Sequence, residues 1–212
     1  MAIKPILFNT EMVRANLDGR KTCTRRLVKP QPDEKHTYPL GFVTDSTEKK
    51  EVGCFGFGIE EYGGSIKYVK PPYQPEDILY VRETWNKGLE RYMYRADYSD
   101  TEKFYQGGKE IEMKWHPSIR MSKEAARIWL KCTDVRVERL QEITEVGIQK
   151  EGVEVDPKEC AGKFDFISEL FLLFQRLWDS TIKKSDLDRY GWDANPYVWV
   201  IEFERCEKPE GV

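Results

Sequence analysis

A cluster of cations and hydroxyl groups lies near the N-terminus, in Gly19-Arg20-Lys21-Thr22-Cys23-Thr24-Arg25-Arg26. A hydroxyl becomes an effective nucleophile when a neighbouring base takes its proton, and a lysine can be that base if burial or nearby positive charge lowers its pKa. Lys21 and Thr24 could form such a pair, with the arginines supplying the charge. The alternative is a solvated basic turn, because Lys and Thr side chains are common on surfaces. We interpret the segment as one wall of a ligand site.

The elements around this segment decide whether the two side chains can meet. Asn9 or Thr10 can cap a helix that ends at Gly19, and residues 22–28 are expected to be extended. In a regular strand, residues three apart point to opposite faces. Lys21 and Thr24 therefore converge only if the chain turns just after the helix.

A second candidate lies in the predicted strand 78–85. Its alternation places Leu79, Val81, Glu83 and Trp85 on one face, so a carboxylate continues an apolar surface. An unpaired charge in such a place is costly. Glu83 is either paired with an arginine at the end of a barrel or is a site residue, and both situations perturb an acid.

The remaining chain predicts one α+β domain over residues 1–212. Residues 30–76, rich in Pro and Gly, read as a hairpin insertion, and residues 157–195 read as a helical insertion. A long strand whose apolar parity shifts near Thr133 and Asp134 indicates a bulge and suits a small barrel. Thr144 can cap a short helix over 145–151. Apolar residues at helical spacing predict a later amphipathic helix, at Ile167, Leu170, Phe171, Phe174, Leu177 and Trp178.

The composition limits the partners. Lys and Arg number 34 against 37 Asp and Glu, for a net charge of −3, whereas proteins that track long duplexes usually carry a positive excess. We therefore expect contact with a single nucleotide, an end or a loop, and no extended duplex binding. The 5 cysteines form no CxxC pair and only 2 histidines are present, so we expect no metal and no cofactor. Without a leader or a long apolar run, we expect a cytoplasmic protein and no membrane partner.

Other catalytic schemes have weaker support. A Cys/His pair would need Cys23 or Cys132 with His116, and no motif accompanies either pairing. A Ser/His/Asp set lacks a nucleophile elbow.

The cationic segment resembles the signature of the ASCH domain, a PUA-like β-barrel family linked to RNA. That signature runs Gly-x-Lys-x-x-Glu-x-Arg, so Gly19, Lys21 and Arg26 match it, and Thr24 stands where many members have Glu. The wider chain is similar to the long ASCH proteins of bacteriophages and prophages, in the stretches ILFNTEMVRANLDGRKTCTRR, ILYVRETW, WHPSIRM and NPYVWVIEFER. This resemblance implies a PUA-like mixed β-barrel with flanking helices and inserted hairpins.

The threonine at position 24 makes the segment similar to the small ASCH amidohydrolases that deacetylate N4-acetylcytidine. By this resemblance Thr24 attacks the acetamide carbonyl, Lys21 accepts its proton, and a later glutamate, aligned with Glu151, protonates the departing amine. Glu142, Glu145 and Glu154 lie nearby in the sequence and are alternatives for that third role.

Substrate binding is assigned to four further residues. Arg26 would hold the base or sugar or stabilise an oxyanion, and Arg25 is a further substrate-binding candidate. Glu83 and Trp85 could face the same pocket for base-edge bonding and stacking. Two functions of different class follow: an amidohydrolase of acetylated cytidine, and a non-catalytic phage module that binds RNA or a modified base. A metal-independent ribonuclease is a third possibility.

Overall fold

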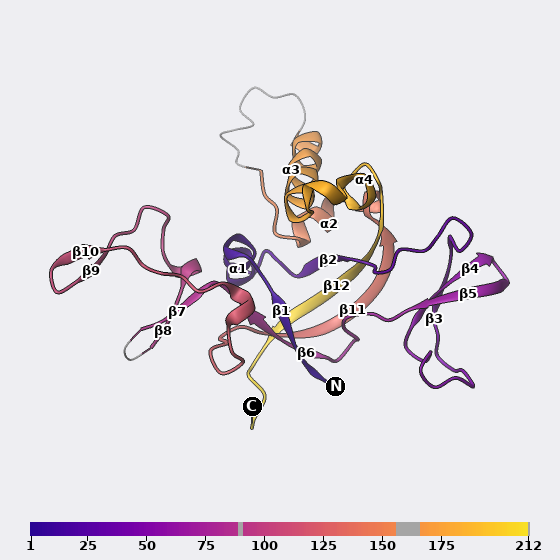
Figure 1. Ribbon diagram of the computed structural model, residues 1–212, viewed down its shortest axis with the longest axis horizontal. Helices are drawn as coiled ribbons and strands as arrows, with labels where there is room; N and C mark the ends of the chain where they lie inside the picture. Colours follow the sequence, from indigo (N-terminus) through magenta and orange to yellow (C-terminus); the bar gives the residue numbers. More distant parts are fainter. Residues whose placement is uncertain (89–90, 156–165, 212) are drawn as a thin grey trace.

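The computed structural model describes residues 1–88, 91–155 and 166–211, and it confirms the α+β class (Figure 1). A curved central sheet carries the helices that follow residue 144 on one side, and two arms of short strands extend in opposite directions from it. The helices are α1 (Thr10–Leu17), α2 (Glu145–Lys150), α3 (Phe166–Thr181) and α4 (Leu187–Tyr190), with short 3-10 turns at Arg95–Asp97, Ser118–Arg120, Leu140–Glu142 and Lys184–Asp186.

The central sheet has five strands in the order β1-β6-β11-β12-β2. Their bounds are β1 (Ile3–Leu7), β2 (Cys23–Leu27), β6 (Ile78–Arg82), β11 (Trp129–Arg139) and β12 (Tyr197–Cys206). β1 pairs with β6 in parallel, and the other neighbours are antiparallel. The register of β11 against β12 shifts between Cys132 and Asp134, so the predicted bulge is confirmed. The bulge increases the local twist of these two long strands.

The sheet curls but does not close into a barrel. Its edge strands β1 and β2 are not hydrogen-bonded to each other as neighbouring strands in the part of the chain described. They nevertheless approach, because Nη2 of Arg26 on β2 donates to the Leu7 carbonyl of β1 at 2.9 Å. Helix α1 connects the two strands and packs Val13 into the core that the sheet encloses. We call the boundary between the two edge strands β1 and β2, where no strand pairing is present among the described residues, the seam.

Two apolar cores lie on opposite faces of the sheet. The inner core is enclosed by the curved sheet. It receives apolar side chains from β1, β6, β11 and β12, including Ile6, Leu79, Leu130 and Trp199. The helix-side core packs α2 and α3 against Cys23, Val198 and Val200. The predicted amphipathic helix is confirmed as α3, whose buried residues are Leu170, Phe174 and Trp178.

Local signals place the helix ends as predicted. The Asn9 side chain caps α1 by accepting from the Met12 amide at 2.8 Å, and Gly19 has a φ of +78° just beyond the helix. Thr144 caps α2 by accepting from the Gly147 amide at 3.1 Å. Both caps satisfy amide groups that have no partner within the helix.

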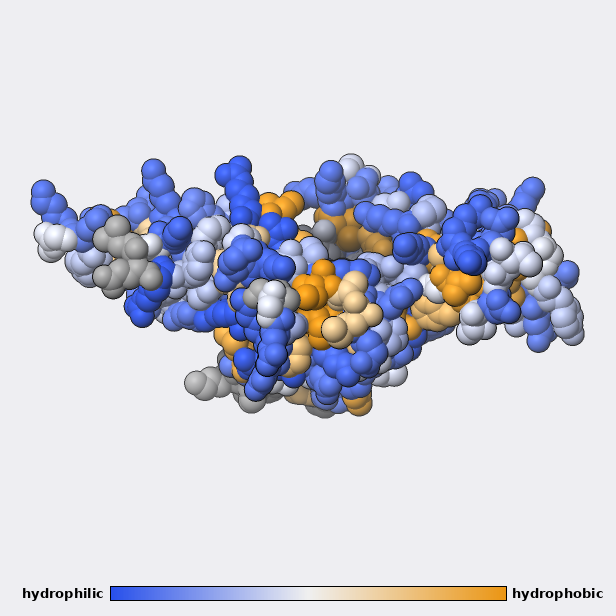
Figure 2. Space-filling view, turned by 90° about the horizontal axis from the view of Figure 1, so that it is seen from below, coloured by the Kyte–Doolittle hydropathy of each residue, from blue (hydrophilic) through white to orange (hydrophobic). Residues whose placement is uncertain are grey.

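The two arms are built from short antiparallel strands. One arm holds β3 (Tyr38–Phe42), β4 (Phe55–Glu60) and β5 (Gly63–Val69) in the order β3-β4-β5, and these three strands lie within the predicted 30–76 insertion. The other holds two hairpins, β7 (Trp85–Lys87) with β8 (Tyr92–Tyr94), and β9 (Phe104–Gln106) with β10 (Lys109–Ile111). Figure 2 shows apolar residues at the centre of one face and on the β3–β5 arm, among polar residues.

The expected strand 78–85 is shorter in the structure. Its central-sheet part ends at Arg82, and Trp85 pairs with Tyr94 and His116 in a different sheet. The change occurs at Glu83 and Thr84, where the chain leaves β1 for the second arm. The helical insertion at 157–195 falls partly on residues 156–165, which lie outside the described residues. Within the described ranges, no helix is long and apolar enough to cross a bilayer.

Candidate functional site

Strand β2 presents two faces with different surroundings. Thr24 pairs with Ile201 and Arg26 pairs with Trp199, and both partners belong to the inner core. Arg25 pairs with Val200, which belongs to the helix-side core. Because paired residues share a face and successive residues alternate, the Thr24 and Arg26 side chains lie on the inner face. Arg25 lies on the helix face.

Lys21 precedes β2 and is fully enclosed. Its side chain has 0% exposure, and Nζ donates to the Cys23 carbonyl at 2.8 Å, the Glu151 carbonyl at 2.9 Å and Glu151 Oε2 at 2.7 Å. Nζ also lies 5.6 Å from the centre of the Phe8 ring. Three acceptors therefore engage the Lys21 amino group, and the Thr24 hydroxyl is not among them.

Glu151 reaches Lys21 because of the way α2 ends. Glu151 is the C-cap residue of α2, and the next residue, Gly152, has a φ of +85°. A Cβ at Gly152 would lie 2.7 Å from the Ala15 Cβ and 3.1 Å from the Lys21 Cβ. Only glycine therefore permits this close approach of α2 to α1. The resemblance implies that Glu151 acts together with Lys21. In the structure these two residues, which are 130 positions apart in the sequence, are in contact.

Arg25 completes this buried charge cluster from the helix face. Its Nη1 lies 3.4 Å from Glu151 Oε1 and its Nη2 lies 3.2 Å from Glu138 Oε2, while Nε is buried without a partner among the described residues. Glu138 is also held by Arg136 at 2.6 Å. A cavity of about 170 Å³ lies beside these groups. Its charged lining residues carry both signs: Arg25, Arg136, Lys150, Glu138, Glu142 and Glu202.

The same surroundings affect Cys23, which also lines this cavity. Burial raises the pKa of the Cys23 thiol to about 12, and the nearby Glu151 carboxylate acts in the same direction. Arg25 and Lys21 oppose this change only in part. Cys23 is therefore a protonated thiol near neutral pH and a poor nucleophile.

Thr24 is buried at 1% exposure, but its hydroxyl makes no hydrogen bond with any described residue. The nucleophile–base contact that the resemblance implies is absent from this arrangement. None of the five principal cavities is lined by Lys21, Thr24 or Glu151.

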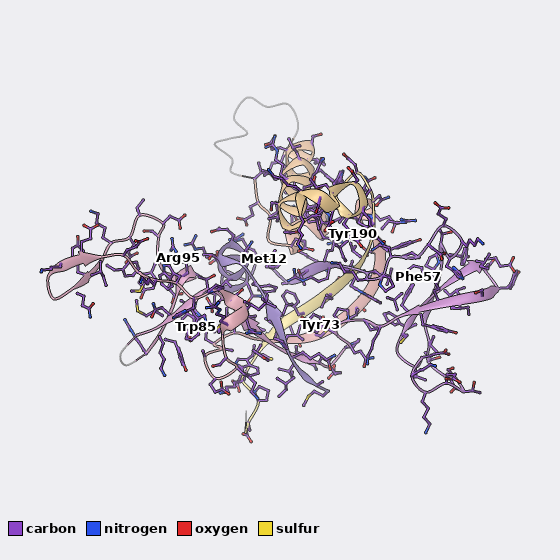
Figure 3. All side chains as sticks on the ribbon, in the orientation of Figure 1. Met12, Phe57, Tyr73, Trp85, Arg95 and Tyr190 are labelled. Carbon is purple, nitrogen blue, oxygen red and sulfur yellow. The ribbon has the colours of Figure 1, made fainter. Side chains whose placement is uncertain are left out.

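Arg26 faces a different cavity, which we call the basic cavity. It has a volume of about 320 Å³ and is lined by Arg26, Leu27, Lys29, Lys70, Pro72, Tyr73 and Trp199. All of its charged residues are cations, and none of the three forms an ion pair with a carboxylate of the described residues. The cavity lies at the seam, where the Tyr73 hydroxyl donates to the Pro5 carbonyl of β1 at 2.8 Å. In Figure 3, Tyr73 lies in the region of the central sheet, between the two arms.

Glu83 and Trp85 have other surroundings. Glu83 is 1% exposed and forms a two-pronged ion pair with Arg127, at 2.9 and 3.0 Å, which corresponds to the paired alternative. Burial raises the pKa of Glu83, although the bonds from Arg127 act in the opposite direction. Trp85 packs edge-on against Tyr92 at 5.6 Å. It begins β7 in the second arm, away from Tyr73 (Figure 3).

Several residues of the site were not identified from the sequence. Asn16 lies on α1 at helical spacing, and its Nδ2 donates to the Lys21 carbonyl at 3.0 Å, which fixes the turn before β2. Lys29, Lys70 and Tyr73 lie where the 30–76 segment leaves and rejoins the central sheet. The only signal for these three in the sequence is their position next to Pro30, Pro71 and Pro72 at these junctions.

Comparison with known proteins gives no relative: no family model, no curated protein and no solved structure matches this chain.

Proposed function

We propose that this protein is an ASCH-type, PUA-like module that recognises single-stranded RNA or a modified nucleoside in the basic cavity. The observation that carries the proposal is the set of three cations without carboxylate partners among the described residues, together with the half-buried Tyr73 ring, around one opening, in a chain of net charge −3. Cations that are not neutralised by carboxylates attract phosphate, and aromatic rings provide stacking surfaces for bases.

The size and position of the cavity agree with this proposal. A volume of about 320 Å³ falls at the lower end of the usual range for small-molecule sites and suits one nucleotide. Arg26 is the signature arginine of the ASCH resemblance, and here it is fixed by its bond to Leu7 at the seam. A sheet that curls around one core and is bridged at its edges supports the kinship with PUA-like barrels, which is part of the proposal.

Nucleotide binding by purified protein tests the proposal. Isothermal titration with cytidine and uridine monophosphates should show binding that weakens about tenfold or more in Arg26→Ala, because hydrogen bonds to charged groups contribute about 1.5–3 kcal/mol. Arg20→Ala is the matched control, since Arg20 pairs with Asp18 and Glu154 outside the cavity. Equal losses in the two variants, or no binding by the wild type, would reject the basic cavity as the site.

A second candidate function is favoured by the Lys21–Glu151 contact at 2.7 Å. An amidohydrolase of N4-acetylcytidine needs an amine, a carboxylate and a hydroxyl close together, and two of the three already meet. For catalysis, Glu151 must first take a proton from Lys21, so that the neutral amine can accept the Thr24 proton as the hydroxyl adds to the acetamide carbonyl, and Glu151 then gives its proton to the departing amine. Cytidine release from N4-acetylcytidine, abolished in Thr24→Ala and retained in the exposed Thr22→Ala, would establish this activity.

A further inference from the structure

The β3–β5 arm has one face in the core and one face in solvent. On the inner face, Phe55 and Val69 pair across β4 and β5 and are 6% and 5% exposed. On the outer face, the middle of β4 carries Gly56 and Gly58, and Glu60 follows at the end of the strand. Gly58 pairs with Tyr38 on β3 and with Ile66 on β5. The middle of the central strand therefore has no side chains on this face.

The glycines allow neighbouring side chains to lie across β4. A Cβ at Gly56 would lie 3.2 Å from Ile66 Cγ2 and 3.6 Å from Tyr68 Cε1, and a Cβ at Gly58 would lie 2.9 Å from Leu40 Cδ1. Any larger residue at these two positions would displace the side chains that now cover the strand. The result is a flat surface of Tyr38, Leu40, Ile66 and Tyr68, which we call the arm platform.

The arm platform is exposed and uncharged. Tyr38, Ile66 and Tyr68 keep 42%, 36% and 38% of their surface in solvent, and the nearest acids on these strands, Glu60 and Glu61, lie at the β4–β5 turn. Exposed aromatic rings on a sheet face are stacking surfaces for unpaired bases, and a glycine within a strand often marks close approach by a ligand.

The arm platform and the basic cavity are linked through Lys70. Lys70, which lines that cavity, follows directly on β5, so Tyr68 lies only two residues away along the same strand. Two residues of strand span about 7 Å. A nucleotide held by Arg26 and Lys70 would therefore have its neighbour within reach of the Tyr68 ring.

We propose that the arm platform binds the bases next to the nucleotide in the basic cavity, so that the protein takes a short single strand of RNA, with Tyr68 as the stacking residue. This inference rests on the proposed function and extends it from one nucleotide to several. Single-stranded RNA is favoured over a folded partner because the arm platform is reached from the cavity through Lys70, a cation without a carboxylate partner in the described chain.

Titrations with uridine monophosphate and with a uridine trinucleotide at fixed salt test the inference. Tyr68→Ala should weaken the trinucleotide about tenfold and leave the monophosphate unchanged, because only the longer ligand reaches the ring. Tyr68→Phe should retain trinucleotide binding, since the aromatic face is kept. Tyr62→Ala is the matched control, because Tyr62 is 89% exposed at the turn of the same arm.

The outcomes separate the two proposals. If Arg26→Ala weakens both ligands while Tyr68→Ala binds the trinucleotide like the wild type, the inference is wrong and the proposed function stands. If the wild type binds neither ligand, both are wrong. A dimer, detected by sedimentation and lost in Tyr68→Ala without any change in RNA binding, would assign the arm platform to a second copy of the chain and overturn the inference.

Discussion

Arg25 and Arg26 are neighbours in the sequence and have opposite surroundings in the structure. Arg25 is enclosed on the helix face of β2 and bonded to Glu138 and Glu151, whereas Arg26 lies on the inner face and lines a cavity without carboxylates. Successive side chains of a strand point to opposite faces of the sheet, and this alternation is enough to give the two arginines different surroundings. Arg25 is therefore paired within the protein, whereas Arg26 has no carboxylate partner among the described residues.

The largest effect is expected from breaking the enclosed cluster. Glu151→Ala leaves the Lys21 ammonium and Arg25 without their shared carboxylate, and removing one partner of a buried pair costs about 3–5 kcal/mol. Urea unfolding should show this loss in the free energy of unfolding. Glu151→Gln, which keeps the shape and an acceptor oxygen, should lose less. Glu154→Ala, at an exposed pair with Arg20, should change stability by less than about 0.5 kcal/mol. Similar losses at 151 and 154 would contradict a buried structural pair.

The next largest effect is expected in the free energy of unfolding when the two arginines are replaced one at a time. Arg25→Ala should lower the free energy of unfolding by about 2–3 kcal/mol, because it leaves buried carboxylate oxygens with fewer partners. Arg26→Ala loses one bond to the Leu7 carbonyl at a solvated edge and should cost about 1 kcal/mol or less. Chemical denaturation of both variants makes the measurement. Equal costs would show that the two faces do not differ as described.

The salt dependence of single-stranded RNA binding should show whether the cations of the basic cavity contact phosphate. Each phosphate contact with a single strand contributes about −0.7 to the slope of log K against log salt, so three cations predict a slope near −2. Lys70→Ala should make the slope less negative by about 0.7, and Lys87→Ala on the other arm should leave it unchanged. A slope near zero for wild type would mean that the cations do not contact phosphate.

The smallest effect is expected in the reactivity of the Cys23 thiol, on the helix face of β2. The pKa of Cys23 is raised to about 12, so at pH 9 its thiol is still protonated in the folded protein, while an ordinary thiol with a pKa of 9.0 is half ionised. The stability that this raised pKa provides is complete below pH 9 and is lost as the pH rises through about 12. Iodoacetamide at pH 9, followed by peptide mapping, should modify the half-exposed Cys206 well before Cys23. Equal rates would indicate that the helix face is open to solvent.

The sequence predicts those features that depend on local signals. Asn9 and Gly19 define α1, Thr144 begins α2, and the parity shift near Thr133 marks the bulge of β11, because caps and alternation act over a few residues. Glu151 was found only through the family resemblance. Its selection over Glu142, Glu145 and Glu154 agrees with the contact to Lys21.

Features that depend on contacts between distant segments were not predictable. The strand 78–85 divides because Trp85 finds partners in Tyr94 and His116, which no local pattern reveals. The basic cavity brings Arg26 together with Lys70 and Tyr73 at the seam. In the sequence these residues are far apart and look like ordinary surface residues, so no local pattern predicts that they meet.

Photo-crosslinking of a short uridine oligonucleotide to the wild-type protein, with the modified residue identified by mass spectrometry, tests the central claim most directly. The account predicts adducts on Tyr73, the half-buried aromatic residue that lines the basic cavity, and their loss in Arg26→Ala. Adducts confined to the aromatic residues of the second arm, such as Tyr105 or Trp115, would contradict it.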